Sequence, residues 1–363
     1  MIAVLGAGGG GCAAAVDLTL RGFSVRLYSR SAQTLAPIRE RGGLRYTGVL
    51  GEGFVAIPGV TNDVAHAVAG ADVVMIVAPM MAHAGLAAAV APHLADGQLL
   101  FLAPGHMALA VPSVLRAAGI RHPVTCETST LPYASRVVAP ATVRVALQVK
   151  RLRFAVFPAN RTAEMARRMA EIYPAIAPLG NVLEAVFLYM NAIHHPPATI
   201  CNAGRIESTG GDFNHYYDGI TPSVGRVIDR VDEERRAIAA ALGVKTEPFV
   251  DYFYHMGYTT EDARVSGLAY EAFHQSEPDR WIKAPPSLQH RYMDEDIPYG
   301  LVPLAALARL GGVATPTMDA LIEIASVLRG IDYRSEGLTL EKMGLADVPR
   351  ADLDRLLTEG FPA

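Results

Sequence analysis

The chain has 363 residues, of which 51% are hydrophobic and 19% are charged, and its formal net charge is −4 at pH 7. This length suits about two domains, and a near-balanced charge without a basic block argues against nucleic acid as a partner. The apolar run at residues 73–78 is too short to cross a bilayer, so we expect no membrane partner. The first strand begins at Ile2, so we expect no secretory signal before it.

The cysteines indicate a reducing environment. The three of them, Cys12, Cys126 and Cys201, suggest neither a disulfide framework nor the spacing of a metal site. We therefore expect a cytoplasmic protein without a metal ion. The sequence says little about oligomeric state, and it is compatible with a homodimer.

Residues 2–18 predict a strand, a glycine turn and a helix. Gly6, Gly8 and Gly11 form G-x-G-x-x-G, in which the first glycine permits the tight turn, the second admits a pyrophosphate and the third permits close packing of helix on strand. The helix N-terminus adds free N–H groups and partial positive charge. The alternative is a plain tight turn, but the context favours a dinucleotide site. Its predicted cofactor contacts in this turn are Gly6, Ala7, Gly8, Gly9, Gly10 and Gly11.

The second strand, Ser24–Tyr28, should end beside the adenine ribose. Sites that prefer NAD usually place Asp or Glu there to bind the 2′-hydroxyl. This chain has Ser29, Arg30 and Ser31 instead. We expect Arg30 to pair with a 2′-phosphate, which favours NADP(H) over NAD(H). The alternative is that Arg30 stacks on adenine or faces solvent.

Continuous apolar runs in the first half predict buried parallel strands. The predicted later strands are Ala71–Ala78, Leu99–Ala103, Val124–Cys126 and Arg153–Phe157. Ligands bind at the carboxyl ends of such strands, so Ala78 and Pro79 are expected to contact the cofactor. The fold class is therefore α/β, with an N-terminal Rossmann-type, doubly wound parallel sheet.

Polar residues follow several of these strands. His83 and His106 lie just past two strand ends, although a loop histidine is more often incidental than functional. The segment Glu127–Tyr133 should face the cofactor. Residues 161–173 have a helical pattern that Pro174 ends. We place the domain boundary near residue 180, which gives a nucleotide domain at 1–180 and an all-helical domain at 181–363.

A helix is expected over Val182–Ile193, and Pro196 and Pro197 should kink or stop it near His195. Asn191 lies one turn before His195 and would share its face. A histidine at such a break suits either an acid/base or a helix cap, and this stretch alone does not decide between them.

Two later helices begin at Thr221-Pro222 and Thr315-Pro316, each with threonine as the N-cap. The first should end near Gly243 and the second at Gly330. Between them, the acidic residues 294–296 suggest a loop or a helix start, or simply a solvated turn.

Several motifs in this order resemble the octopine (opine) dehydrogenase family. They cover most of the chain and are more specific than the glycine turn, which many oxidoreductases share. The matching segments are residues 6–11, 127–133, 191–196, 202–207, 217–222 and 295–300.

The resemblance implies a nucleotide domain joined to an all-helical domain, with substrate in the cleft. It implies NAD(P)H-dependent reductive condensation of the α-amine of an L-amino acid with a pyruvate-like 2-oxo acid. A histidine followed by proline is the family's acid/base and matches His195. The resemblance also assigns Asp296 as its partner, Arg291 as the ligand of the oxo-acid carboxylate, and Glu127 as a substrate contact. We also expect Asn191, beside the acid/base, to bind substrate.

The reaction suits these residue types. A histidine with near-neutral pKa can take and return protons, a carboxylate fixes its tautomer, and an arginine fork binds a carboxylate with two hydrogen bonds. His194 lies next to His195, so the sequence leaves open which one acts. Two rivals also remain: a 2-oxo or 2-hydroxy acid reductase of similar plan, such as a ketopantoate-type enzyme, and a non-catalytic NADP-binding sensor.

Overall fold

The computed structural model describes residues 1–362. The chain divides into two units, one formed by Met1–Ala185 together with the segment that begins at Asp352, and the other by Val186–Ala351. The predicted limits were 1–180 and 181–363, so the main difference lies at the C-terminal end.

Unit 1 contains a sheet of eight strands. The strands in spatial order are β12 (Ile176–Pro178), β11 (Leu152–Phe157), β8 (Thr125–Thr128), β7 (Leu99–Leu102), β6 (Val73–Ile76), β1 (Ile2–Leu5), β2 (Val25–Tyr28) and β5 (Gly59–Thr61). The six strands from β8 to β5 are parallel, whereas β11 pairs antiparallel with β8 and parallel with β12. Strands β1, β6 and β7 are buried throughout, as expected for continuous apolar runs covered on both faces.

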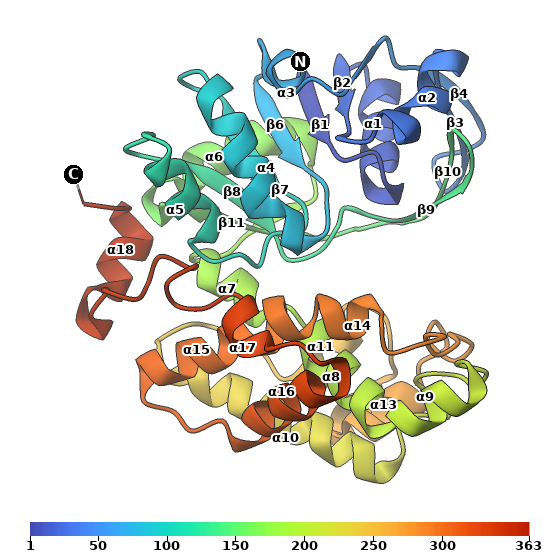
Figure 1. Cartoon of the computed structure of the whole chain (residues 1–363), viewed down its shortest axis with the longest axis vertical. Helices are drawn as coiled ribbons and strands as arrows, with labels where there is room; N and C mark the ends of the chain where they lie inside the picture. Colours follow the sequence, from blue (N-terminus) through green and yellow to red (C-terminus); the bar gives the residue numbers. More distant parts are fainter. Residues whose placement is uncertain (363) are drawn as a thin grey trace. The chain divides into compact units, whose positions relative to one another are not determined.

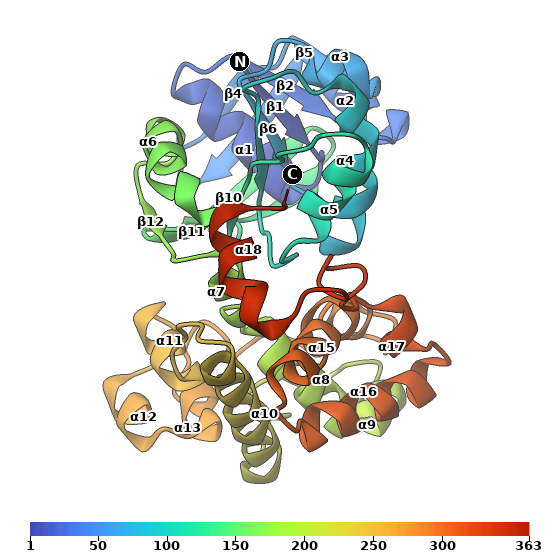
Figure 2. The same ribbon diagram turned by 90° about the vertical axis from the view of Figure 1, so that its left-hand side faces the viewer.

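Helices cover both faces of this sheet, which confirms the predicted Rossmann-like α/β class. Figure 2 shows α1 and α6 on one face and α3, α4 and α5 on the other. The helical segments of the unit before residue 186 are α1 (Gly9–Leu20), α2 (Ala32–Arg41), α3 (Val64–Val68), η1 (Met80–Ala82), α4 (His83–Val90), η2 (Ala91–His93), α5 (Ala110–Ala117), η3 (Ala159–Arg161), α6 (Thr162–Ile172) and the start of α7 (Val182–Phe187).

A second, four-stranded sheet packs on α1 (Figure 1), and the sequence did not predict it. Its strands in spatial order are β4 (Gly53–Ala56), β3 (Gly43–Gly48), β10 (Thr142–Gln148) and β9 (Tyr133–Ala139). The buried Tyr133 hydroxyl donates to the Asp17 carboxylate on α1 at 2.7 Å. Tyr133 therefore ties this sheet to α1.

The C-terminal segment returns to unit 1. After η5 (Arg350–Asp352), helix α18 (Leu353–Glu359) contacts η3. The Phe361 ring packs edge-on against Phe157 at 5.2 Å, and the Arg116 guanidinium lies 4.8 Å from its centre. The C-terminal segment therefore completes unit 1 rather than the helical half.

Unit 2 is helical, with an isolated β-bridge between Asn214 and Lys283. The long helix α10 (Pro222–Ala241) contacts α8, α13, α15 and α16 (Figure 2). The other helical segments are α8 (Asn191–Cys201), α9 (Ala203–Thr209), α11 (Phe249–His255), α12 (Glu261–Ser266), α13 (Ala269–His274), α14 (Arg291–Asp294), the π-helical turn η4 (Ile297–Leu301), α15 (Val302–Gly311), α16 (Pro316–Arg329) and α17 (Tyr333–Glu336).

The two predicted helix starts differ in their caps. The Thr221 side chain accepts a hydrogen bond from the Val224 N–H, as predicted for α10. Thr315 makes no such bond at the start of α16. The Glu234 carboxylate on α10 instead accepts the N–H groups of Thr317 and Met318 at 2.9 and 3.0 Å. This buried carboxylate caps α16 from another helix, which local sequence does not reveal.

Candidate functional site

Steric limits explain the glycine turn at the end of β1. Gly6 has a φ of +132°, and a Cβ on it would lie 2.0 Å from the Val77 carbonyl oxygen. A Cβ on Gly11 would lie 1.7 Å from the Gly6 carbonyl oxygen. Either side chain would push β1, β6 and α1 apart. A Cβ on Gly8 would meet nothing within 4 Å, so its backbone faces open space.

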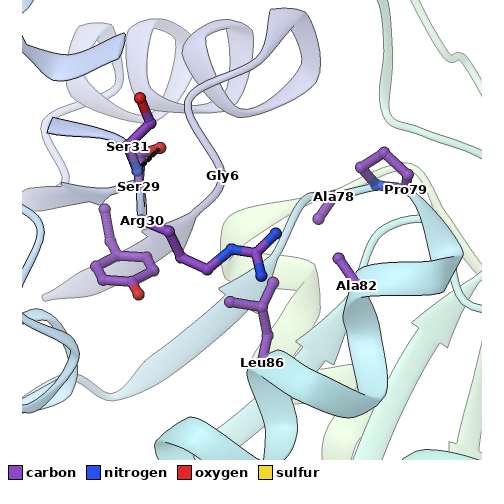
Figure 3. Close-up of a pocket in the computed structure, with 9 residues that line it drawn as sticks. Gly6, Ser29, Arg30, Ser31, Ala78, Pro79, Ala82 and Leu86 are labelled. Atoms are coloured by element: carbon purple, nitrogen blue, oxygen red, sulfur yellow. Dashed lines mark hydrogen bonds between the residues drawn. The ribbon is translucent and has the colours of Figure 1, made fainter. Parts of the chain in front are cut away.

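A pocket of about 550 Å³ adjoins this turn (Figure 3). Gly6, Arg30, Ala78 and Pro79, all expected to contact a cofactor, line it. Its complete lining is Gly6, Tyr28, Ser29, Arg30, Ser31, Ala78, Pro79, Ala82 and Leu86. The other expected contacts, Ala7, Gly8, Gly9, Gly10 and Gly11, are not among these residues. The hydrogen-bond donors of Ser29, Arg30 and Ser31 suit the adenosine of a dinucleotide, and the open backbone beside Gly8 leaves room for its phosphates.

Arg30 reaches across this pocket toward Ala82 and Leu86 (Figure 3). Ser31 is the N-cap of α2, and its hydroxyl accepts the Thr34 N–H at 3.1 Å. The pocket therefore combines a guanidinium with the positive end of a helix dipole, and no carboxylate lines it.

Glu127 lies in unit 1, buried at the end of β8. Its Oε1 atom has no hydrogen-bond partner within residues 1–362. Burial raises the pKa of this carboxyl to about 8, although the Met107 backbone N–H acts in the opposite direction. A buried oxygen without a partner is uncommon in folded proteins, and a bound ligand or water is one of its explanations.

The two histidines that follow strand ends in this unit have structural partners, and His83 begins α4 rather than lying in a loop. His83 is buried and its Nε2 bonds to the Ala78 carbonyl at 2.9 Å. His106 is also buried, and its Nδ1 bonds to the Ala185 carbonyl at 2.9 Å. These bonds hold backbone near the strand ends and suit the incidental role better than the chemical one.

In unit 2, His195 and Asp296 lie side by side although 101 residues separate them. The His195 Nδ1 is 2.7 Å from one Asp296 carboxylate oxygen, and Tyr189 donates its hydroxyl hydrogen to the other. Both residues of the pair are buried. With Nδ1–H donating to Asp296, the lone pair of Nε2 is left to accept a proton.

The environment favours a neutral imidazole. Burial lowers the pKa of His195 well below its ordinary value, and Arg291 and His290 act in the same direction. Burial raises the pKa of Asp296 to about 6, opposed by the Tyr189 hydrogen bond and by Arg291. At neutral pH, Asp296 is therefore ionised and His195 is a base whose charged form the carboxylate would stabilise.

His194 has a different environment from His195. Its Nδ1 bonds to the Met190 carbonyl at 2.9 Å, and its ring packs among Phe249, Phe253 and Phe273. Burial lowers its pKa well below the ordinary value. These contacts mark His194 as part of the core.

The helix was predicted to kink or stop at the prolines, and it does not stop there. The helix expected over Val182–Ile193 ends at Phe187, and α8 begins at Asn191 and continues through Pro196 and Pro197 to Cys201. The prolines deprive two carbonyls of helical donors, but residues 192–199 are all buried. Packing on every side therefore overrides the local preference, and His195 lies within a helix rather than at its end.

Arg291 and Asn191 lie in the same unit as the pair. Arg291 begins α14, its side chain is 56% exposed, and its guanidinium is 3.0 Å from the Glu295 carboxylate. Asn191 is half-buried at the start of α8, one turn before His195. Asp294 ends α14, and Glu295 and Asp296 form the turn before η4. Both residues of this turn are buried, so it is not the solvated turn that the sequence also allowed.

Three tyrosines complete this cluster, and we did not predict them. Tyr189 holds Asp296, Tyr216 lies 2.8 Å from His195 Nε2, and the Tyr292 ring stacks on the His195 ring at 3.8 Å. Tyr189 lies in an apolar run that gives no sign of a polar role. Tyr292 directly follows the predicted substrate ligand Arg291, and this was the only sequence feature that pointed to any of the three tyrosines.

Other features concern metals, membranes and thiols. Among residues 1–362, no group of three or more His, Cys, Asp or Glu side chains is arranged to hold a metal ion. None of the helices in that range has the length and apolar character needed to span a membrane. Cys12, Cys126 and Cys201 are free thiols.

Known proteins match both halves of the chain. The sequence model of the NAD/NADP octopine/nopaline dehydrogenase alpha-helical domain matches residues 178–329, and that of ketopantoate reductase PanE/ApbA matches residues 2–134. An opine dehydrogenase of Arthrobacter sp. (strain 1C) is 37% identical over 353 residues, which cover 97% of each chain.

Solved structures share the fold along its length. An octopine dehydrogenase in complex with NADH and agmatine superposes with a TM-score of 0.79 at 20% identity, over 100% of this chain and 98% of that one. Yersinopine dehydrogenase bound to NADP⁺ superposes with a TM-score of 0.73 at 18% identity, over 99% and 98% of the two chains.

Proposed function

We propose that this chain, which belongs to the opine dehydrogenase family of NAD(P)-dependent oxidoreductases, condenses the α-amine of an amino acid with a pyruvate-like 2-oxo acid and reduces the resulting imine. The observation that carries the proposal is the buried His195–Asp296 pair, held at its far side by Tyr189. A binding protein without chemistry has no need for such a pair, which argues against a sensor.

The residues of unit 2 supply the proton transfers. The amine must lose a proton before it attacks the oxo carbon, and His195 is a neutral base at working pH. The imidazolium so formed, stabilised by Asp296, returns the proton to the departing hydroxyl, which leaves as water. When bound, the nicotinamide cofactor supplies the hydride that reduces the imine.

Glu127 and Asn191 are our candidates for further substrate contacts. The unpartnered Oε1 of Glu127 suits an ammonium group. Since burial raises its pKa to about 8, binding of a cation there would release a proton near neutral pH. Asn191 offers an amide one turn from His195.

One experiment tests the reaction directly. The enzyme is incubated with NADPH, pyruvate and pooled amino acids, and the products are identified by mass. We expect a condensed secondary amine. A 2-hydroxy acid formed equally well without amino acids would indicate a ketopantoate-type reductase, and absence of turnover would indicate a sensor.

We further propose that NADP(H) is preferred over NAD(H), because Arg30 and the N-terminus of α2 line the pocket and no carboxylate does. Arg30→Ala should raise KM for NADPH about 10- to 100-fold, which corresponds to one charge-assisted hydrogen bond, and should leave NADH nearly unaffected. Arg39→Ala is the control, since Arg39 lies on α2 but its guanidinium bonds to Asn62. Equal losses with both cofactors would refute a 2′-phosphate role.

Arg291 is proposed to bind the oxo-acid carboxylate. Arg291→Lys should raise KM for the oxo acid about tenfold, because a point charge cannot replace a planar fork with two donors. The half-buried Arg264, which pairs with Glu261, gives the control Arg264→Lys, for which no change is expected. A rise confined to KM for the amino acid would show that Arg291 binds the other substrate.

The cytoplasm is the location that we propose, on the basis of the three free thiols.

A further inference from the structure

The inner end of a hydrogen-bonded chain of side chains is Asp296, and its outer end is Tyr292. Asp296 contacts His195 Nδ1 at 2.7 Å, and the His195 Nε2 lies 2.8 Å from the Tyr216 hydroxyl. That hydroxyl lies 3.2 Å from the Tyr292 hydroxyl, and either of the two can donate. All four side chains belong to unit 2.

This arrangement leaves neither ring nitrogen of the proposed base, His195, free to contact substrate. Both nitrogens of His195 are engaged, Nδ1 by Asp296 and Nε2 by Tyr216. His195 and Tyr216 are buried, whereas Tyr292 is only half-buried. Tyr292 is also adjacent in sequence to Arg291, whose side chain is exposed. Of His195, Tyr216 and Tyr292, the least buried residue is therefore Tyr292 and not His195.

We propose that Tyr216 and Tyr292 relay protons between His195 and the bound substrate, so that the buried pair acts through two phenols. This inference rests on the proposed function, because it takes Arg291 as the group that holds the oxo acid near Tyr292. It gives Tyr216 and Tyr292 a role in proton transfer in addition to that of the His195–Asp296 pair.

The relay conserves protons and moves no electrons between groups. In the dehydration step the His195 Nε2–H bond breaks and its proton goes to the Tyr216 oxygen. The Tyr216 proton moves to the Tyr292 oxygen, and the Tyr292 proton goes to the departing hydroxyl, which leaves as water. Deprotonation of the amine runs along the same path in reverse. Each phenol is neutral before and after a transfer.

The surroundings suit such a path. Burial raises the pKa of Tyr216 well above its ordinary value, and burial also raises that of Tyr292. Neither phenol therefore persists as a phenolate. His215 lies beside both rings, at 4.9 and 5.0 Å between centroids, and its nitrogens have no hydrogen-bond partner among the described residues. Burial lowers its pKa to about 3, so it does not take the proton.

Stacking keeps the relay in place when a hydroxyl is removed. The Tyr292 ring stacks on His195 and the Tyr216 ring stacks on Phe273 at 5.2 Å. Tyr→Phe changes retain both ring contacts, so they remove the proton path alone.

The test compares Tyr216→Phe, Tyr292→Phe and the double variant with the wild type in the condensation reaction. Each single change should lower kcat about 10²-fold, the low end for a positioned proton-transfer group. The double variant should lose little more, since the groups act in one chain. The solvent deuterium isotope effect of the wild type should involve several protons and should fall in each variant. Tyr217→Phe is the matched control, because the side-chain contacts of Tyr217 are with the His274 ring and the Arg280 guanidinium, outside the chain of hydrogen bonds.

Two results would overturn the relay. If Tyr216→Phe keeps wild-type kcat and isotope effect while His195→Ala is inactive, Tyr216 is a cover that substrate displaces. Multiplicative losses in the double variant would show that the phenols act separately. Wild-type enzyme that forms no condensed product would instead refute the proposed function. Should a Phe variant fail to fold, difluorotyrosine at position 216 preserves the ring and hydroxyl, and an unchanged kcat would then reject the relay.

Discussion

Loss of either member of the buried pair should lower kcat by about 10²–10⁴-fold, the usual contribution of a positioned acid/base. His195→Ala removes the base itself. Asp296→Asn keeps the volume but loses the charge that favours the imidazolium and fixes its tautomer. Cofactor affinity, followed by nicotinamide fluorescence, should be unchanged, because the predicted cofactor residues lie in unit 1.

The double variant and the neighbouring histidine provide the controls. His195→Ala combined with Asp296→Asn should lose little more than one change alone, as coupled catalytic groups do. His194→Ala should lower the melting temperature, because its ring packs among three phenylalanines, but should keep most of kcat. An inactive His194→Ala that folds normally would move the acid/base role to His194.

The same pair predicts a pH dependence. Burial raises the pKa of Asp296 to about 6, and the carboxylate must be ionised to hold the Nδ1–H of His195. The value of kcat/KM should therefore fall as the pH drops through about 6. Initial rates measured at a series of pH values on both sides of that point check this expectation. A rate that stays constant across the series would show that Asp296 does not titrate there.

Arg235→Met should destabilise the protein by about 3–5 kcal/mol, the usual cost of removing one partner of a buried ion pair. Arg235 is fully buried, and its guanidinium bonds to the Asp232 carboxylate at 2.6 and 2.9 Å. It also donates to the carbonyls of Phe187 and Glu247, each at 2.5 Å, and to the Thr246 hydroxyl. Methionine occupies much of the volume but leaves one Asp232 oxygen and these other acceptors without the donor that Arg235 provides. Urea unfolding measures the loss.

Arg236 offers a matched control on the same helix. It pairs with the other oxygen of Asp232 at 3.0 Å, but its side chain is 42% exposed. Arg236→Met should therefore cost no more than about 1 kcal/mol. Similar losses in both variants would mean that burial does not set the energy of this cluster.

The sequence predicted those parts of the fold that depend on contacts between residues close together in the chain. The turn at Gly6 and Gly11 was predictable because both glycines are required by contacts within one β–α unit. The sheet of β3, β4, β9 and β10 was not, because its pairing joins Arg45 to Thr142, far apart in sequence. The same limit applies to the cap that Glu234 provides for α16.

The site shows the same division. The pocket residues Arg30 and Pro79 follow strand ends that the apolar pattern reveals. The pairing of His195 with Asp296 came only from the family resemblance, since no local pattern joins residues 101 positions apart. The proline pair even suggested the wrong geometry for His195, because tertiary burial of α8 outweighs the hydrogen bonds that the prolines remove.

The return of the C-terminal segment to unit 1 sets an order of events during synthesis. Unit 2 is an insertion between Ala185 and Asp352, and at usual translation rates roughly 10–30 s separate the emergence of these two points from the ribosome. Throughout that interval Phe157 lacks the Phe361 ring that later packs against it. Unit 1 is therefore completed only by residues that are synthesised after all of unit 2. A nascent chain released before those residues are made would leave the Phe157 ring without its Phe361 partner.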